Sequence, residues 1–455
     1  MLQLPADFEA LMRLQLNEEY DQFLHSLNQV APTSIRFNPY KTSSSHLEID
    51  ASVAWASNAY YLKNRPSFTF DPYFHAGHYY VQEASSMFIE QALLNSVNLK
   101  EDLKVLDLCA APGGKSTHLL SLISQNSLLI SNEVISTRAS ILVENISKWG
   151  RANCIVTNNE PEHFKAFQSC FDVVLIDAPC SGEGMFRKDP DAIQEWSLNN
   201  VNICSSRQTR IINEAADLVK EGGVLIYSTC TYNLKEDVDP VTQLFESGEW
   251  ESIRIPIEQY DGIIERVETK GHSIYGYHFY PHKIKGEGFF LSVMRKISTE
   301  NSYWPKVKKD NNFLNKKDKQ VIQNYMDTSQ YNCITHEQSV LCFPATLEKE
   351  MLGILNTSLR IKKFGLNMGQ LIRDELIPEH TYALSDFATE YFDSVDLSYE
   401  EAISYLQKNN FNLNTSAKGW KIMRYEKANL GFAKLMGNRM NNHYPKEWRI
   451  RSEMN

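Results

Sequence analysis

Short hydrophobic runs rich in valine and isoleucine alternate with helical stretches in the middle of the chain. The runs lie at residues 104–108, 128–132, 154–158, 171–177 and 223–228. Runs of this length that alternate with helices are typical of buried parallel strands. We therefore predict an α/β domain with a doubly wound parallel sheet over residues 99–299.

The segments on either side of this domain carry different patterns. Residues 1–98 have apolar positions at helical spacing followed by loops, which predicts a helical segment without a sheet. Residues 275–296 alternate in two halves around a glycine-containing turn, which predicts a hairpin that closes the sheet. Residues 300–319 are rich in lysine and asparagine, so we expect a linker there. Residues 320–455 would then form a separate C-terminal module.

The composition excludes several classes of protein. The chain has 455 residues, of which 42% are hydrophobic and 22% charged, as in packed globular domains. No apolar run approaches the roughly 18 residues of a membrane span, and the acidic start does not fit a signal peptide. We expect a cytoplasmic protein that does not bind membranes. Its eight cysteines form no CxxC pair and have no nearby histidine, so we expect neither a metal site nor a redox pair.

The net charge of −10 is unevenly distributed. Residues 1–300 carry 25 basic and 38 acidic side chains, so this part should bind nucleic acid poorly by itself. Residues 407–455 carry ten basic side chains against three acidic ones, as expected of a surface that binds phosphates, although an ordinary domain with one basic face would look the same. Aromatic residues suited to base stacking are interleaved with this charge: Trp420, Tyr425, Phe432, Tyr444 and Trp448.

The loop after the first predicted strand is suited to a ligand, because two adjacent glycines let backbone amides approach it at the start of a helix. Its sequence ends like a nucleotide-triphosphate loop, but GxxxxGK[ST] requires glycine at position 109. A nucleoside-containing cofactor is the other candidate, and Glu133 after the second strand is placed to bind its ribose. The loop consists of Cys109, Ala110, Ala111, Pro112, Gly113, Gly114 and Lys115.

Two cysteines follow the fourth and fifth predicted strands. Because parallel strands end at one edge of a sheet, Asp177, Cys180 and Cys230 should meet in one cleft with the cofactor. A thiolate that adds to carbon 6 of a pyrimidine makes carbon 5 nucleophilic enough to accept a methyl group. Asp177 is suited to stabilise the ring nitrogen as charge develops there. The spacing leaves open which cysteine attacks.

At these residues the chain resembles the Sun/Nop (NSUN) family of S-adenosylmethionine-dependent RNA cytosine-C5 methyltransferases. Residues 74–87 and 430–450 further resemble its bacterial RsmF-like branch, which modifies 16S ribosomal RNA. The resemblance implies a Rossmann-like methyltransferase sheet, an N-terminal helical segment that contacts RNA and a C-terminal PUA-like RNA-binding domain. The family motifs lie at residues 106–120, 176–190, 222–231 and 286–296.

The resemblance also implies roles for individual residues. Cys230 would be the nucleophile, and Cys180 would assist release of the product. The family commonly has an aspartate after its third strand to contact the adenine; Asn159 stands at that register here, and Glu160 is a competing choice. The pocket for S-adenosylmethionine would be lined by residues 109–115, Glu133, Asn159 and Asp177.

The resulting hypothesis is a monomeric methyltransferase that acts on cytosine in 16S ribosomal RNA or in the small ribosomal subunit. Two alternatives stay open. A P-loop-like NTPase would hydrolyse ATP, and a non-catalytic RNA-binding assembly factor would keep the fold without methyl transfer.

Overall fold

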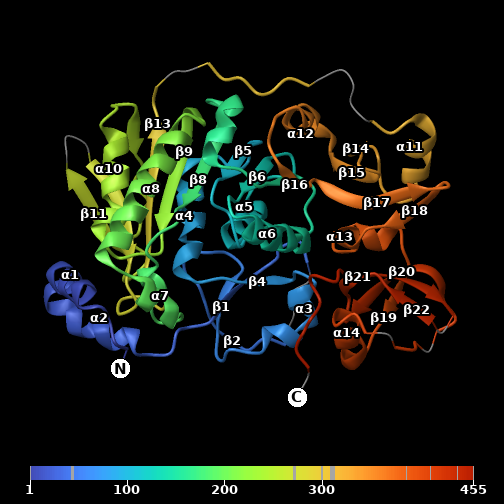
Figure 1. Cartoon of the computed structure of the whole chain (residues 1–455), viewed down its shortest axis with the longest axis horizontal. Coiled ribbons are helices and arrows are strands. Elements are labelled where there is room, and N and C mark those ends of the chain that lie inside the picture. Colours follow the sequence, from blue (N-terminus) through green and yellow to red (C-terminus); the bar gives the residue numbers. More distant parts are fainter. Residues whose placement is uncertain are drawn as a thin grey trace.

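The structure is a computed structural model that describes residues 2–41, 46–269, 273–298, 301–307, 313–385, 387–409, 411–413, 415–437 and 439–453. Its strands form one ten-stranded sheet and three four-stranded sheets (Figure 1). In the described part of the chain, no helix combines the length and apolar character needed to cross a membrane.

The centre of the large sheet consists of the five strands predicted from the sequence. They run parallel in the order β7-β6-β5-β8-β9, so the predicted doubly wound sheet is confirmed. The strand order changes direction at β5, where such sheets bind ligands. The strands are β5 (Lys104–Asp107), β6 (Leu128–Asn132), β7 (Cys154–Thr157), β8 (Phe171–Asp177) and β9 (Val219–Thr229).

Helices cover both faces of this sheet, which explains why the strands are apolar throughout. The first face packs against α4 (Ile89–Ser96), α5 (Gly114–Leu122) and α6 (Ser136–Trp149). The second face packs against α8 (Leu198–Ala216), α10 (Asp239–Phe245) and α12 (Glu348–Leu355). Two short helices, α7 (Pro190–Glu195) and α9 (Leu234–Asp237), lie in the loops before α8 and after β9.

The predicted closing hairpin is also confirmed. β12 (Ser273–Phe279) and β13 (Phe289–Lys296) pair antiparallel, and β13 pairs with β9. Two strands that the sequence did not indicate extend this edge: β10 (Trp250–Ser252) pairs with β13, and β11 (Ile264–Thr269) pairs with β12.

The N-terminal segment contains a sheet, so the expectation of a purely helical segment is wrong. The helices α1 (Ala6–Leu16) and α2 (Tyr20–Leu27) are present. They are followed by an antiparallel sheet in the order β2-β3-β1-β4 that lies below the large sheet in Figure 1. Its strands have only three or four residues, too few for a period of two to stand out. They are β1 (Ser34–Phe37), β2 (Ile49–Ser52), β3 (Ala59–Leu62) and β4 (Tyr79–Val81).

The C-terminal part forms two further sheets and adds a strand to the large one. β16 (Ile361–Phe364) pairs antiparallel with β7. The helices are α11 (Lys316–Ile322), α13 (His380–Ala383) and α14 (Tyr399–Leu406). One sheet contains β14 (Tyr331–His336), β15 (Ser339–Pro344), β17 (Leu366–Ile372) and β18 (Glu375–Pro378). The other contains β19 (Ser394–Asp396), β20 (Lys418–Tyr425), β21 (Ala428–Met436) and β22 (Arg439–Asn442).

The expected linker at residues 300–319 differs from the structure at both ends. The ring of Trp304 packs against Phe167 and Phe171 of the large domain, with ring centroids 5.0 and 5.7 Å apart. Helix α11 begins at Lys316, inside the expected linker. Residues 299–300 and 308–312 lie outside the described residues.

Cys333 and Cys342 form a disulfide, so the expectation of no redox pair is wrong for these two. They lie directly opposite each other on the paired strands β14 and β15. A separation of nine residues across a hairpin brings two side chains together, which a search for CxxC spacing does not detect.

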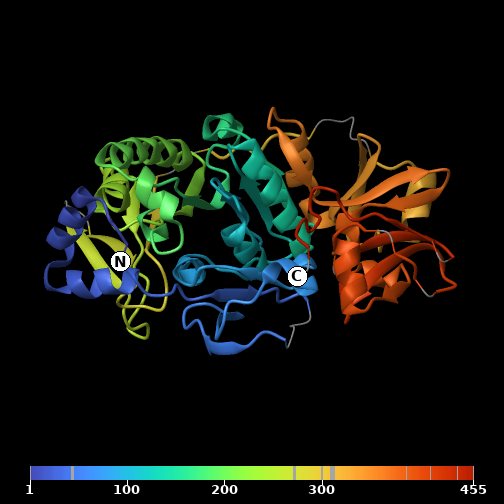
Figure 2. The same ribbon diagram turned by 60° about the horizontal axis from the view of Figure 1, so that its bottom comes forward.

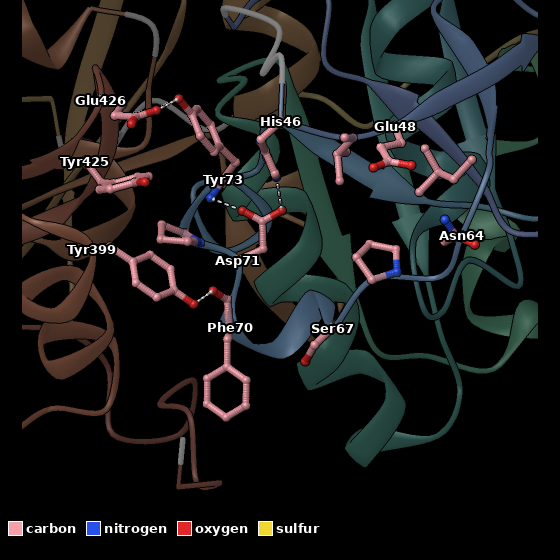
Figure 3. Close-up of a pocket in the computed structure, with 14 residues that line it drawn as sticks. His46, Glu48, Asn64, Ser67, Phe70, Asp71, Tyr73, Tyr399, Tyr425 and Glu426 are labelled. Carbon is pink, nitrogen blue, oxygen red and sulfur yellow. Dashed lines mark hydrogen bonds and ion pairs between the residues drawn. The ribbon is translucent and has the colours of Figure 1, made fainter. Parts of the chain in front are cut away.

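The N-terminal sheet also contacts the C-terminal part (Figure 3). The Tyr73 hydroxyl donates to the Glu426 carboxylate at 3.0 Å, and the Tyr399 hydroxyl donates to the carbonyl oxygen of Phe70 at 3.0 Å. Burial, followed by the hydrogen bond to Glu426, raises the pKa of Tyr73 to about 12. Tyr73 belongs to α3 (Pro72–His75). The segment between β3 and β4 therefore docks against the part of the chain that contains α14 and β20. In Figure 2 the N-terminal sheet lies below the large sheet and the C-terminal sheets lie to its right.

Candidate active site

The loops that follow three central strands meet at one edge of the large sheet. β5 ends at Asp107, β8 at Asp177 and β9 at Thr229. Because the strand order changes direction at β5, the connections on its two sides leave a crevice at this edge. All of the predicted functional residues except Gly113 and Asn159 line a cavity at this crevice.

The loop after β5 is fixed by its neighbours. Arg138 of α6 donates to the carbonyl oxygen of Ala111 at 2.7 Å. Gly113 has a φ of 116°, a left-handed conformation that favours glycine, and it precedes the first residue of α5. The first turn of α5 then presents Lys115 to the crevice.

Lys115 is held by a carboxylate. Its Nζ lies 2.8 Å from Oδ2 of Asp177, and the Ser228 hydroxyl donates to Oδ1 of Asp177 at 2.9 Å. Burial alone would lower the pKa of Lys115, but Asp177 raises it above its usual value, so the side chain is an ammonium. A lysine held in this way is not free to bind nucleotide phosphates, and the NTPase alternative gains no support.

The structure brings the two strand-end cysteines together. The Sγ atoms of Cys180 and Cys230 lie 3.0 Å apart, and both are free cysteines. The hydrogen bond with Cys230, and then burial, raise the pKa of Cys180 well above its usual value. Either thiol can be the donor in this contact, and the raised pKa of Cys180 favours Cys180 as the thiol that keeps its proton.

Two cavities meet at these residues. The Glu133 cavity has a volume of about 560 Å³ and the Lys115 cavity about 520 Å³. Each is named after a residue that lines it and not the other. The two cavities adjoin each other at the residues that line both: Cys109, Ala111, Arg138, Asp177 and Cys230.

The residues predicted to bind the cofactor divide between the two cavities. Gly113 and Asn159 line neither cavity. Cys109, Ala111, Glu133 and Asp177 line the Glu133 cavity. The Lys115 cavity is lined by Cys109, Ala110, Ala111, Pro112, Gly114, Lys115 and Asp177.

The side chain of Asn159 is engaged away from both cavities. It donates to the carbonyl oxygen of Arg360 at 3.3 Å and accepts the backbone amide of Arg360 at 3.0 Å. Glu160, the competing choice, lines the Glu133 cavity. The adenine contact stays a prediction, and the geometry favours Glu160.

Asp107 is a fully buried carboxyl at the wall of the Lys115 cavity. The Ser116 hydroxyl donates to its Oδ2 at 2.6 Å, whereas Oδ1 has no hydrogen-bond partner among the described residues. Burial raises the pKa of Asp107 to about 7. Sequence reasoning missed this residue, although it ends β5 and lies two positions before the first residue of the ligand loop.

A buried carboxylate behind the thiols was also missed. Glu183, three residues after Cys180, is fully buried. It accepts the backbone amides of Tyr232 and Asn233 at 2.8 and 3.0 Å. These two residues lie two and three positions after Cys230, so the loop that contains Cys180 binds the loop that contains Cys230.

Glu236 makes the reverse connection. Glu236 is buried and lies six residues after Cys230. It accepts the backbone amide of Ser181, the residue after Cys180, at 2.9 Å. Gln208 of α8 donates to the same carboxylate at 2.9 Å. We call Glu183 and Glu236 the carboxylate clamp. Glu183, after Cys180, binds backbone amides after Cys230, and Glu236, after Cys230, binds the backbone amide after Cys180. The only signal in the sequence was an acid shortly after each cysteine.

The aromatic residues of the basic C-terminal region are not all on a surface. Phe432 and Tyr444 are buried in the C-terminal core, so the expectation that they stack on bases is wrong. Two basic side chains are paired with acids: Lys421 with Asp393, and Arg424 with Asp396 at 2.7 Å. The alternation of rings and charges reflects strands with one buried face. Trp420, Tyr425 and Trp448 stay partly exposed.

Comparisons with known proteins agree with this arrangement. Family models described as "16S rRNA methyltransferase RsmB/F", "N-terminal domain of 16S rRNA methyltransferase RsmF" and "Methyltransferase RsmF PUA domain" match residues 94–295, 4–84 and 392–450. The chain is 30% identical to ribosomal RNA small subunit methyltransferase F of Shewanella loihica, over 82% of this chain and 77% of the relative. The protein of that name from Shewanella piezotolerans is 28% identical over 94% and 93%.

Solved structures share the fold at lower identity. NSun6 from Pyrococcus horikoshii matches with a TM-score of 0.53 and 19% identity, over 65% of this chain and 98% of that one. A methyltransferase homologue from the same organism matches with a TM-score of 0.55 and 24% identity, over 65% and 96%. From its matching domains and its relatives, the chain belongs to the RsmB/F family of 16S rRNA methyltransferases and, within it, to the RsmF branch.

Proposed function

We propose that this protein transfers a methyl group from S-adenosylmethionine to carbon 5 of a cytosine in small-subunit ribosomal RNA, through a covalent adduct with Cys230. The observation that carries the proposal is the pair of thiols 3.0 Å apart at the ends of β8 and β9. The relatives' names support ribosomal RNA as the substrate, and the matched PUA domain supports RNA binding. A substrate in ribosomes would place the protein in the cytoplasm.

The two cavities fit the methyl donor. Glu133, at the end of β6, is placed to accept the ribose hydroxyls in the Glu133 cavity. The unpartnered Oδ1 of Asp107 suits the ammonium of the methionyl group, which would end the isolation of this buried oxygen. When bound, S-adenosylmethionine supplies an electrophilic methyl group on a sulfonium.

Cys230 starts the reaction by adding to the base. A bond forms between its sulfur and carbon 6 of the cytosine, and the electron pair of the double bond moves through the ring towards N3. The ammonium of Lys115 favours the negative charge on the attacking sulfur. The Lys115–Asp177 pair holds a proton at the junction of the cavities and can give it to N3 as charge builds there.

Methyl transfer follows the addition, and release of the methylated base then reverses the addition. Carbon 5 takes the methyl group while the methyl–sulfonium bond breaks, and its proton then passes to water through the Lys115 cavity. The bond between carbon 6 and sulfur breaks, and N3 returns its proton to the pair. Cys180 donates a hydrogen bond to the departing sulfur of Cys230 at 3.0 Å, which stabilises the thiolate.

Bisulfite sequencing of ribosomal RNA tests the proposal. A strain that lacks this gene should lose 5-methylcytosine at a position of the small-subunit RNA, and the wild-type gene should restore it. A gene carrying Cys230→Ala should not restore it. A complete set of methylated cytosines in the deletion strain would refute the proposal and favour a non-catalytic assembly factor.

A further inference from the structure

We propose that a groove between the N-terminal sheet and the large sheet binds the phosphates of single-stranded RNA and leads the target base to Cys230. This inference rests on the proposed function and adds where the RNA lies. The groove has a volume of about 1090 Å³ and is formed by residues 29–33, 50, 62–65, 187–188 and 281–286. We call it the basic groove.

The lining of the basic groove is strongly cationic although residues 1–300 are acidic as a whole. Asp50 is the only acid among the described residues that line it. A polyanion would therefore meet positive charge on both walls, from the N-terminal sheet and from the large domain. Six lining residues are lysine or arginine: Lys63, Arg65, Arg187, Lys188, Lys283 and Lys285. Burial lowers the pKa of His282, which also lines the groove, so its ring adds no charge near neutral pH.

Part of this charge is balanced inside the protein. Arg187 and Lys188 share Glu287, at 2.9 and 3.3 Å, and Lys283 pairs with Glu19 at 2.6 Å. Lys285 pairs with Asp50.

Lys63 and Arg65 form no ion pair with a described acid, and both side chains are exposed. Arg65 instead stacks on the ring of Phe68, which holds its guanidinium in place. These two residues are the groove's most available phosphate ligands.

The basic groove adjoins the active site, because four residues line both the groove and the Lys115 cavity. Pro32, Thr33, Arg65 and Lys188 line both the basic groove and the Lys115 cavity. Cys230 in turn lines both the Lys115 cavity and the Glu133 cavity. The basic groove, the Lys115 cavity and the Glu133 cavity therefore adjoin one another in that order, from the cationic surface to the thiols and the expected position of the methyl donor.

The volume of the Lys115 cavity restricts which form of nucleic acid can reach Cys230. A cavity of about 520 Å³ admits a base but not a duplex, so the target nucleotide must be unpaired or turned out of its helix. A cationic groove that follows the backbone up to such a cavity is the arrangement expected for a single strand. The described lining of the groove includes no residue after 286, so this contact does not depend on the C-terminal module.

The test compares RNA binding across a salt series for the full-length protein and the double variant Lys63→Gln/Arg65→Gln. The probe is a short single-stranded RNA of mixed sequence, and binding is measured without the methyl donor. Each lost phosphate contact on a single strand lowers the log–log salt slope by about 0.7, so the variant should lose about 1.4. In methylation assays the loss should appear as a higher KM for RNA.

A matched double variant, Lys100→Gln/Lys349→Gln, removes the same charge at the opposite edge of the sheet. Both lysines are exposed, Lys100 precedes β5, and α12 carries Lys349 beside the start of β5 through the Glu350–Lys104 pair. Equal slopes for both variants would overturn the assignment of the groove. A slope loss confined to the groove variant supports it even if no RNA is methylated, in which case only the proposed function fails.

Discussion

Replacement of Cys180 by alanine should trap the enzyme on its RNA. The change removes the one thiol that lies within hydrogen-bond distance of the sulfur of Cys230, at 3.0 Å. The backbone of the loop stays in place because Glu236 accepts the amide of Ser181 and Gln208 donates to the carbonyl oxygen of Pro179, and neither contact involves the side chain of Cys180. The departing sulfur then leaves without a donor to share its charge.

The size of the effect follows from that single contact. A hydrogen bond to a charged group contributes about 1.5–3 kcal/mol, which corresponds to a roughly 10- to 150-fold slower breakdown of the adduct. Addition should be affected less, because the ammonium of Lys115 still favours a negative charge on the sulfur of Cys230. Cys180→Ser keeps a donor and should restore part of the release rate.

Denaturing gels with labelled RNA and S-adenosylmethionine measure the trapped species directly. The alanine variant should show a heat-stable band of protein joined to RNA, the serine variant a weaker one, and the wild type little. If the band appears with Cys230→Ala instead, the two cysteines have exchanged roles. If no variant gives a band, the reasoning from the 3.0 Å contact is refuted.

Three further predictions concern neighbouring residues. Cys230→Ala should abolish methyl transfer and leave the affinity for S-adenosylmethionine within about twofold by calorimetry, because the thiol attacks the base and not the donor. Glu183→Gln should lower the free energy of unfolding in urea by about 2–4 kcal/mol, because the new amide nitrogen leaves two buried donors without an acceptor. The control Glu195→Gln changes an exposed side chain and should leave the free energy of unfolding unchanged. Asp107→Asn should flatten the pH dependence of stability: burial raises the pKa of Asp107 to about 7, so the wild type is stabilised at low pH and loses that stability as pH rises through about 7. Urea titrations at about pH 5 and about pH 8 should therefore differ more for wild type than for the variant.

The sheet and the position of the site could be predicted because both follow from local pattern. Five buried parallel strands need continuous apolar runs, and these are visible without any knowledge of the partners. Once the strands are known, the rule that their carboxyl ends share an edge places Asp177 and Cys230 together. The 3.0 Å contact with Cys180 then depends only on two loops of few residues.

Features that depend on distant partners could not be predicted. β16 joins the large sheet from about 200 residues beyond its partner β7, and a strand of four residues carries no pattern of its own. The clamp residues Glu183 and Glu236 look like surface acids, because only the fold shows the backbone amides that surround them. The same applies to Asn159, whose position after the third strand predicted a cofactor contact but whose amide is bound to Arg360.

Net charge gave little information about where RNA binds, because charges act only over short distances in salt solution. At physiological ionic strength a charge acts over roughly 8 Å, so RNA senses the residues beside it and not the sum over 300 residues. Asp50 is the only acid among the described residues that line the basic groove, where Lys63 and Arg65 form no ion pair with a described acid, so two available cations remain there whatever the total. In the C-terminal region the reverse occurs, because Lys421 and Arg424 count as basic yet are paired with aspartates. The catalytic part should therefore bind RNA better than its charge of −13 suggests.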